Sequence, residues 1–257
     1  MIHRLRPALP RVLFFSVLSW IFLLQVGDAN AVGLPTITFG VEDANTPGQV
    51  SNALQVLFVL TILSVAPAIL LMTTCFTRIV IVLGFVRQAM GTQNMPPTQV
   101  ILGLSLFLSF FVMSPTFNRI NEEALQPYLN EEVDQPTALE KAVAPMRDFM
   151  FGQVREDELT LLTEITMDSE PMDPEDIPTM TLIPAFMLSE LKRAFQMGFM
   201  IYIPFLVIDM IVASILMSMG MMMLPPVIIS MPFKLLLFVL VDGWSLVVGS
   251  LIKSFGV

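Results

Sequence analysis

Four long apolar stretches constrain this chain more than any other feature of its sequence: residues 50–72, 98–116, 199–224 and 227–251. A helix needs about 20 mainly apolar residues to cross roughly 30 Å of hydrocarbon, and each stretch is at or near that length. In lipid, only helices and closed barrels satisfy all their backbone hydrogen bonds. No segment shows the alternation typical of a substantial strand, so the sequence predicts an all-α membrane protein.

An acidic segment divides the four stretches into two pairs. Residues 116–185 carry 16 acidic and 4 basic side chains, whereas the whole chain has 22 and 13. Proline and helix-capping patterns predict short helices here, and residues 185–198 form an amphipathic pattern that leads into the third stretch. We therefore expect two helical hairpins with a small, water-exposed, helical acidic domain between them.

The N-terminus has the pattern of a cleavable signal peptide. Three arginines precede an apolar run at residues 12–26, and Ala29 and Ala31 have the small side chains of a cleavage site. The run is short for a membrane span, and an uncleaved first span is the alternative. The expected divisions are a signal peptide at 1–31, an outer N-terminal segment at 32–49, a first helical pair at 50–115, the acidic domain at 116–198 and a second hairpin at 199–257.

Two arginines indicate the orientation. Arg78 and Arg87 lie between the first two stretches with no acidic residue nearby, which places that connection in the cytoplasm by the positive-inside rule. The acidic domain and the mature N-terminus then lie outside. Lys192, Arg193 and Lys253 fit this orientation poorly, because they would lie outside as well.

The composition argues against most enzymes and against nucleic-acid binding. Cys75 is the single cysteine and His3 the single histidine, so one copy of the chain offers no zinc cluster, no Ser-His-Asp triad and no Cys-His pair. The net charge of −9 is opposite to what a phosphate backbone attracts. We expect no catalytic residues, no cofactor and no metal.

Two ionisable residues lie inside the last pair of stretches. Asp209 and Lys234 are equally far from a turn expected near residues 220–223, so a hairpin would bring the two charges to one height. An unpaired charge at mid-bilayer costs at least about 2.5–3.5 kcal/mol. We expect a direct pair; the alternatives are solvation by an aqueous pore and pairing with a different subunit. Asp242 is a third such charge, with no evident partner in the sequence.

Methionines cluster at the same turn. Met221, Met222 and Met223 lie between a glycine and two consecutive prolines, which discourage a regular helix. Methionine is flexible and apolar, which suits a surface that closes without being rigid. A cluster of this kind is otherwise typical of core filling or of a lipid-facing surface.

Another apolar cluster interrupts the acidic segment. Met146, Phe149, Met150 and Phe151 are more than a chain of short helices needs to expose. We expect Phe149, together with Glu190 in the following helix, to contact a neighbouring subunit. The alternative is that the cluster forms the domain's own small core.

Three segments carry a resemblance to a known family: residues 77–87, 184–199 and 204–226. They are similar to the FliP family of flagellar type III export-gate proteins, and the similarity runs from about residue 50 to the C-terminus. The resemblance implies about five copies that assemble with FliQ, FliR and FlhB into a helical, cone-like pore. That pore would stand largely on the periplasmic side of the bacterial inner membrane, in the flagellar basal body, with the acidic domain in the periplasm. The loop at 221–223 would be the pore gate, and helices would be broken at Pro67, Pro204 and Pro232.

The function that follows is a non-enzymatic pore subunit that conducts unfolded flagellar proteins across the membrane. One alternative is the equivalent subunit of a virulence injectisome. Another is a small-ion or solute channel or transporter that uses Asp209 and Lys234 as a relay. The acidic domain and the methionine turn favour the first function, because coordination of a small solute needs neither.

The signal peptide gives a direct test. If it is removed after Ala31, N-terminal sequencing of protein extracted from membranes begins at Val32. Recovery of intact Met1 as the main species would show that the first apolar run is retained.

Overall fold

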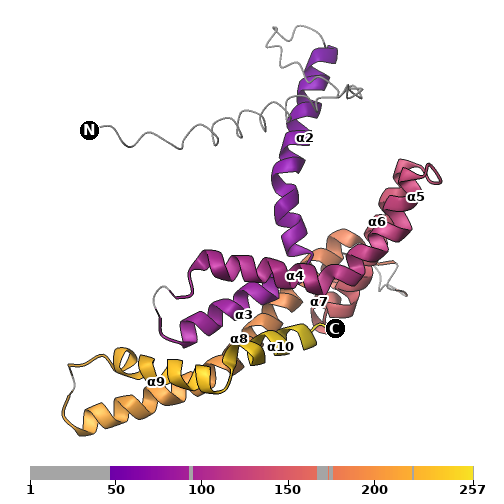
Figure 1. The fold of residues 1–257 in the computed structure, drawn as a ribbon. Helices are drawn as coiled ribbons and strands as arrows, with labels where there is room; N and C mark the ends of the chain where they lie inside the picture. The colour runs from indigo at the N-terminus through magenta and orange to yellow at the C-terminus, as the bar shows by residue number, and fades with distance from the viewer. Residues whose placement is uncertain (1–46, 93–94, 167–172, 174–175, 222, 257) are drawn as a thin grey trace, which may run out of the picture. The chain divides into compact units, whose positions relative to one another are not determined.

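The computed structural model describes residues 47–92, 95–166, 173, 176–221 and 223–256. Every regular element in these ranges is a helix, which confirms the all-α prediction (Figure 1). The expected signal peptide, with Ala29 and Ala31, and most of the segment at 32–49 lie outside the described residues. The chain forms two units, Met1–Val56 and Leu57–Val257, and all the packing described below lies within the second.

Three helices are long and apolar enough to cross a membrane. They are α2 (Pro47–Met72), α4 (Thr98–Ile120) with its continuation, and α8 (Thr179–Ser218). A π-helical turn (Asn121–Leu125) and α5 (Gln126–Leu129) extend α4. Helices α9 (Pro226–Leu240) and α10 (Gly243–Lys253) make a fourth candidate if counted together, although they are bent by 64°.

Prolines lie inside these helices without ending them. Pro67, Pro204 and Pro232 are interior residues of α2, α8 and α9, so the expectation of broken helices at these positions is wrong. A proline removes one backbone hydrogen bond and clashes with the preceding turn. The result can be a bent helix rather than a helix that ends. Apolar helices tolerate that loss where neighbouring groups satisfy the freed carbonyl.

The partner of α4 is not the first apolar stretch but a short helix, α3 (Phe76–Ala89). Arg87 Nη1 donates a hydrogen bond to Thr98 Oγ1 at 2.9 Å, and Cys75 Sγ donates to the Ser109 carbonyl at 3.7 Å, so α3 and α4 form an antiparallel hairpin. We expected residues 73–97 to be a connection. That was wrong because 14 residues are too short to span a bilayer, yet α3 carries the apolar stripe of a helix: Ile79, Val82, Leu83 and Val86 are all buried.

Helix α3 packs against α8, and the two run parallel. Arg78 meets Glu190 at one end, and farther along Phe85 packs edge-on against Phe195, with ring centroids 5.6 Å apart. Gly198 permits the close approach, because a Cβ at that position would overlap the Phe85 ring. The amphipathic pattern at 185–198 and the third apolar stretch are therefore parts of one 40-residue helix, with no break at residue 198.

Helices α8 and α9 form a second hairpin, as the sequence predicted. Phe205 and Phe238 pack between the arms, with ring centroids 6.2 Å apart. At the bend before α10, a Cβ on Gly243 would overlap the Phe238 ring, so glycine is required there. Beyond the bend, Leu251 of α10 and Phe255, which follows α10, enter the core formed with α3.

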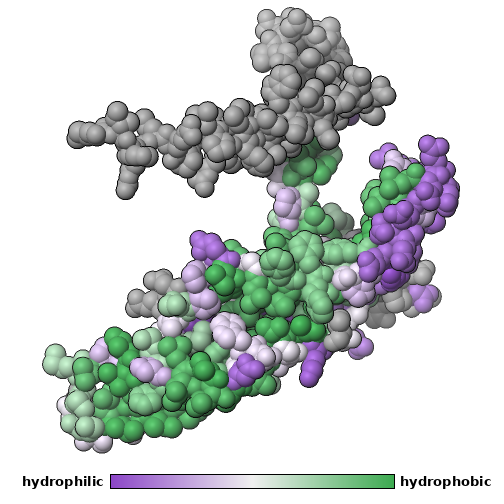
Figure 2. All heavy atoms as spheres, viewed as in Figure 1, coloured by the Kyte–Doolittle hydropathy of each residue, from purple (hydrophilic) through white to green (hydrophobic). Residues whose placement is uncertain are grey.

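The acidic domain consists of α6 (Gln135–Gln153), α7 (Glu156–Thr166) and the beginning of α8. Met150, Leu182 and Phe186 form its buried core. Figure 2 shows hydrophilic residues gathered over α5 and α6, whereas hydrophobic residues dominate the surface over the two hairpins. The contrast matches the separation of acidic and apolar segments in the sequence.

The alkylation rate of Cys75 tests whether the α3–α4 hairpin is packed as described. Its side chain is fully buried, and burial raises the pKa of the thiol to about 11. At pH 7, roughly one thiol in ten thousand would be ionised, and only the thiolate reacts rapidly with a maleimide. We expect native protein in membranes to resist alkylation and SDS-denatured protein to react completely. Equal rates in the two states would contradict the described hairpin.

Candidate functional site

The methionine-rich turn lies between α8 and α9. Helix α8 ends at Ser218, Gly220 has a φ of +75°, and α9 starts at Pro226. The left-handed backbone at Gly220 lets the chain leave the helix. The side chain of Met223 is 97% exposed and that of Met221 is partly buried, whereas Met222 lies outside the described residues. The hairpin thus carries exposed thioether at its tip.

The hairpin brings Asp209 and Lys234 together. Lys234 Nζ lies 2.6 Å from Asp209 Oδ2, and the Lys234 side chain is 2% exposed against 19% for Asp209. Ser230 Oγ donates a hydrogen bond to Asp209 Oδ1, so both carboxylate oxygens are engaged. Sequence reasoning missed Ser230, although its position four residues before Lys234 puts both on one face of α9.

The ammonium of Lys234 also lies beside the turn that ends α3. A Cβ placed on Gly91 would be 3.8 Å from Lys234 Nζ and 3.7 Å from Val227 Cγ1. Gly91 has a φ of +73° and follows the last turn of α3. A cation at the C-terminal end of a helix is favourable because unpaired carbonyls point toward it. The buried charge pair therefore lies close to the turn that follows α3.

Asp242 differs from the paired aspartate on the same hairpin. It lies at the bend between α9 and α10, with a φ of +50°, and its side chain is exposed. Within the part of the chain that the structure describes, its carboxylate has no hydrogen bond or ion pair. The contrast with Asp209 gives a matched control for charge removal.

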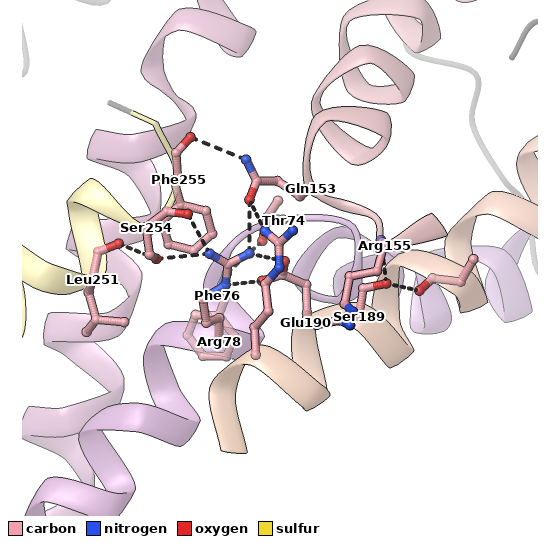
Figure 3. Close-up of polar contacts among 12 residues, drawn as sticks. Thr74, Phe76, Arg78, Gln153, Arg155, Ser189, Glu190, Leu251, Ser254 and Phe255 are labelled. Atoms are coloured by element: carbon pink, nitrogen blue, oxygen red, sulfur yellow. Dashed lines mark hydrogen bonds and ion pairs between the residues drawn. The ribbon is translucent and has the colours of Figure 1, made fainter. Parts of the chain in front are cut away.

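A second buried charge lies at the other end of α3 (Figure 3). Arg78 is fully buried, and its guanidinium donates two hydrogen bonds to Glu190, one of them from Nε at 2.8 Å. It donates another to Gln153 Oε1 at 3.0 Å. Two more go to the carbonyl and hydroxyl of Ser254, at 3.0 and 2.9 Å, and the Phe255 ring covers the guanidinium with its centroid 3.8 Å from Cζ.

This placement corrects the role given to Arg78 as a cytoplasmic marker. Its partners Gln153 and Glu190 belong to the segment assigned to the acidic domain, so Arg78 is buried against that segment rather than solvated in a separate loop. Both hairpins begin and end beside the acidic domain, because α6 also packs against α4 and Ser254 follows α10. Sequence reasoning missed the site because an arginine between two apolar stretches has the same pattern whether it is solvated or buried.

Two of the three cations that fitted the orientation poorly, Lys192 and Arg193, also contact residues of α6 and α7, whereas Lys253 is exposed. Lys192 Nζ donates to Glu158 Oε1 at 2.8 Å, and this hydrogen bond lowers the pKa of the Glu158 carboxyl. Arg193 Nη1 donates to Gln153 Oε1 at 3.1 Å. These hydrogen bonds account for the two cations on α8, so neither residue needs the positive-inside rule to explain its position.

The expected subunit contacts lie inside the single chain. Glu190 is fully buried against Arg78, so a neighbouring subunit has no access to its carboxylate in this arrangement. Phe149 is half-buried and packs on Phe186, with ring centroids 5.9 Å apart. It touches both core clusters. The arrangement supports the alternative that this cluster is the domain's own core.

Among the described residues, no group of three or more His, Cys, Asp or Glu side chains is placed to hold a metal ion. The features that the structure does bring together are the two ion pairs, Arg78–Glu190 and Lys234–Asp209, and the exposed side chain of Met223.

Comparison with known proteins gives consistent relatives. The FliP family model matches residues 59–251. The chain is 56% identical to flagellar biosynthetic protein FliP of Bacillus subtilis (strain 168) over 212 residues, which cover 82% of this chain and 96% of that protein. It is 46% identical to the protein of the same name from Borreliella burgdorferi over 248 residues, or 95% of this chain and 96% of that one. A relative in Aquifex aeolicus is 50% identical over 211 residues, or 81% and 88% of the two chains.

The buried pair on the hairpin can be tested by charge exchange. Asp209→Lys or Lys234→Asp leaves two like charges in contact, and breaking a buried pair costs about 3–5 kcal/mol. We expect either reversal to abolish motility and to lower the yield of folded protein, and the double exchange to restore part of both. Asp242→Asn is the control, and we expect it to be neutral. A double exchange no better than the worse single variant would contradict a direct pair.

Proposed function

Because the chain belongs to the FliP family of flagellar biosynthesis and export proteins, we propose that it is a pore subunit of the flagellar type III export gate. In this function it conducts unfolded flagellar proteins across the bacterial inner membrane. The observation that carries the proposal is the exposed methionine tip on a hairpin whose buried charges are paired internally. Such a tip offers apolar, adaptable contacts at the end of a rigid support.

Uncovered apolar surface supports assembly with other chains. In α2, none of the residues Gln55–Met72 is buried. Large apolar side chains are also exposed along α8 and α9. This surface must face lipid or other helices, and a continuous apolar surface of this extent is typical of interaction sites. We propose a homo-oligomer of about five copies that forms a cone-like pore with FliQ, FliR and FlhB, in contact with membrane lipid in the flagellar basal body.

The contacts at Arg78 support one orientation of both hairpins. Because each hairpin begins and ends beside the acidic domain, each enters and leaves from that side. With the acidic domain in the periplasm, the end of α3 and the methionine tip point away from it, toward the membrane. In this orientation several methionine tips can converge on one axis.

The alternative of a small-ion channel or transporter relies on Asp209 and Lys234 as a relay. In the described hairpin each charge is already satisfied, since Ser230 and Lys234 occupy both oxygens of the carboxylate. A relay would have to break this pair at every transfer. The close flagellar relatives also favour the flagellar export gate over the equivalent injectisome subunit.

The gate can be tested by shortening the tip. We expect the combined variant Met221→Ala, Met222→Ala and Met223→Ala to assemble normally and to make the membrane leaky to ions, because small side chains leave a wetted opening. Ile at the same positions should keep the barrier and slow export, because its β-branched side chain is stiff at χ1. Ion permeability and secretion of an unfolded flagellar substrate are measured in the same cells.

Three exposed methionines on the shaft of α8 provide the matched control: Met200, Met210 and Met217. Their combined replacement by Ala removes three exposed methionine side chains from α8 and leaves the tip intact. We expect no ion leak in this variant. An assembled tip variant with unchanged permeability would rule out the methionine gate. Loss of conductance with normal secretion in Asp209→Asn would instead identify a small-ion channel.

A further inference from the structure

The end of the chain completes the burial site of Arg78. Helix α10 ends at Lys253, and the next two residues turn into the core. Ser254 accepts two hydrogen bonds from Arg78, through its carbonyl and its hydroxyl. Phe255 places its ring over the guanidinium, and its carbonyl accepts a hydrogen bond from Gln153 Nε2 at 3.2 Å.

These contacts use the full hydrogen-bonding capacity of the arginine. A guanidinium has five N–H donors and no acceptor. In the structure, two bonds go to Glu190, one to Gln153 and two to Ser254. Without the C-terminal residues, two donors and one face of the guanidinium would lose their partners. An unsatisfied buried donor is costly, and more so on a charged group.

We propose that Ser254 and Phe255 form a C-terminal clasp. The clasp completes the site of Arg78 and thereby locks the second hairpin to α3 and to the acidic domain. Four segments meet there: the beginning of α3, the end of α6, the first half of α8 and the residues after α10. Only the residues after α10 contribute from outside a helix, so this segment can leave without unfolding one.

The chain around the end of α10 is buried on one side only. Leu251 and Phe255 enter the core, whereas Lys253 between them is exposed. Phe255 therefore has two roles, apolar packing and coverage of the guanidinium. A test must separate these roles, because apolar packing alone would not depend on the charge of Arg78.

Cys75 provides the readout, because it is fully buried three residues before Arg78 and is the only cysteine. The full-length protein, in membranes of cells that express the other export-gate proteins, is compared with a chain that ends at Lys253. We expect alkylation of Cys75 to accelerate about tenfold or more, because each hydrogen bond to a charged group contributes about a factor of ten to a local equilibrium. Lys253→Ala is the matched control, and we expect no acceleration.

The dependence on charge is tested in a second background, Arg78→Met with Glu190→Gln, which removes both members of the buried pair. There the same deletion should change the alkylation rate by less than about twofold, because the clasp has no guanidinium to satisfy. Equal acceleration in both backgrounds would overturn the clasp and leave only apolar packing by Phe255. Unchanged protection of Cys75 in the shortened chain would overturn it as well.

A point variant covers the case in which cells degrade the shortened chain. Phe255→Leu keeps the length and most of the apolar volume but removes the aromatic face over Arg78. We expect faster alkylation than in the full-length protein in the native background, and no difference from the parent when Arg78 is Met. No acceleration in the native background would contradict a role for the ring.

Discussion

Removing an arginine from water is costly, and the guanidinium of Arg78 is completely buried. It is tolerated because a carboxylate, an amide, a hydroxyl and a backbone carbonyl surround it and accept every donor. These partners come from distant parts of the chain. The site therefore joins the acidic domain to both hairpins, since a missing partner would leave part of a buried charge unsatisfied.

Helix α3 connects this site to the second buried ion pair. Arg78 lies in its first turn, and Lys234 lies beside the glycine that follows its last turn. Between them, the close contact of Phe85 with Gly198 sets the spacing to α8. A helix held at its first turn by the bonds of Arg78 and farther along by the contact of Phe85 with α8 has little freedom to slide. The position of the methionine tip relative to the acidic domain follows from this support.

Sequence reasoning predicted the features that depend on local pattern. Apolar length predicted the long helices, and equal separation from a turn predicted that Asp209 and Lys234 would meet. It failed where tertiary context decides. The helix at Phe76–Ala89 was missed because a membrane criterion based on length excludes short buried helices. Arg78 was read as a solvated cation because its partners Glu190 and Ser254 are far away in the sequence, and no local pattern identifies them.

The separation of those partners in the sequence means that the ribosome makes Arg78 well before its last partner. Glu190 follows Arg78 by 112 residues and Ser254 by 176 residues. At about 5–20 residues per second, a ribosome needs roughly 9–35 s to add the last partner. During that interval the hydrogen bonds of Arg78 to Ser254 cannot form, and its buried site is incomplete. Newly made helices therefore spend seconds at the membrane before Ser254 and Phe255 can complete the site of Arg78.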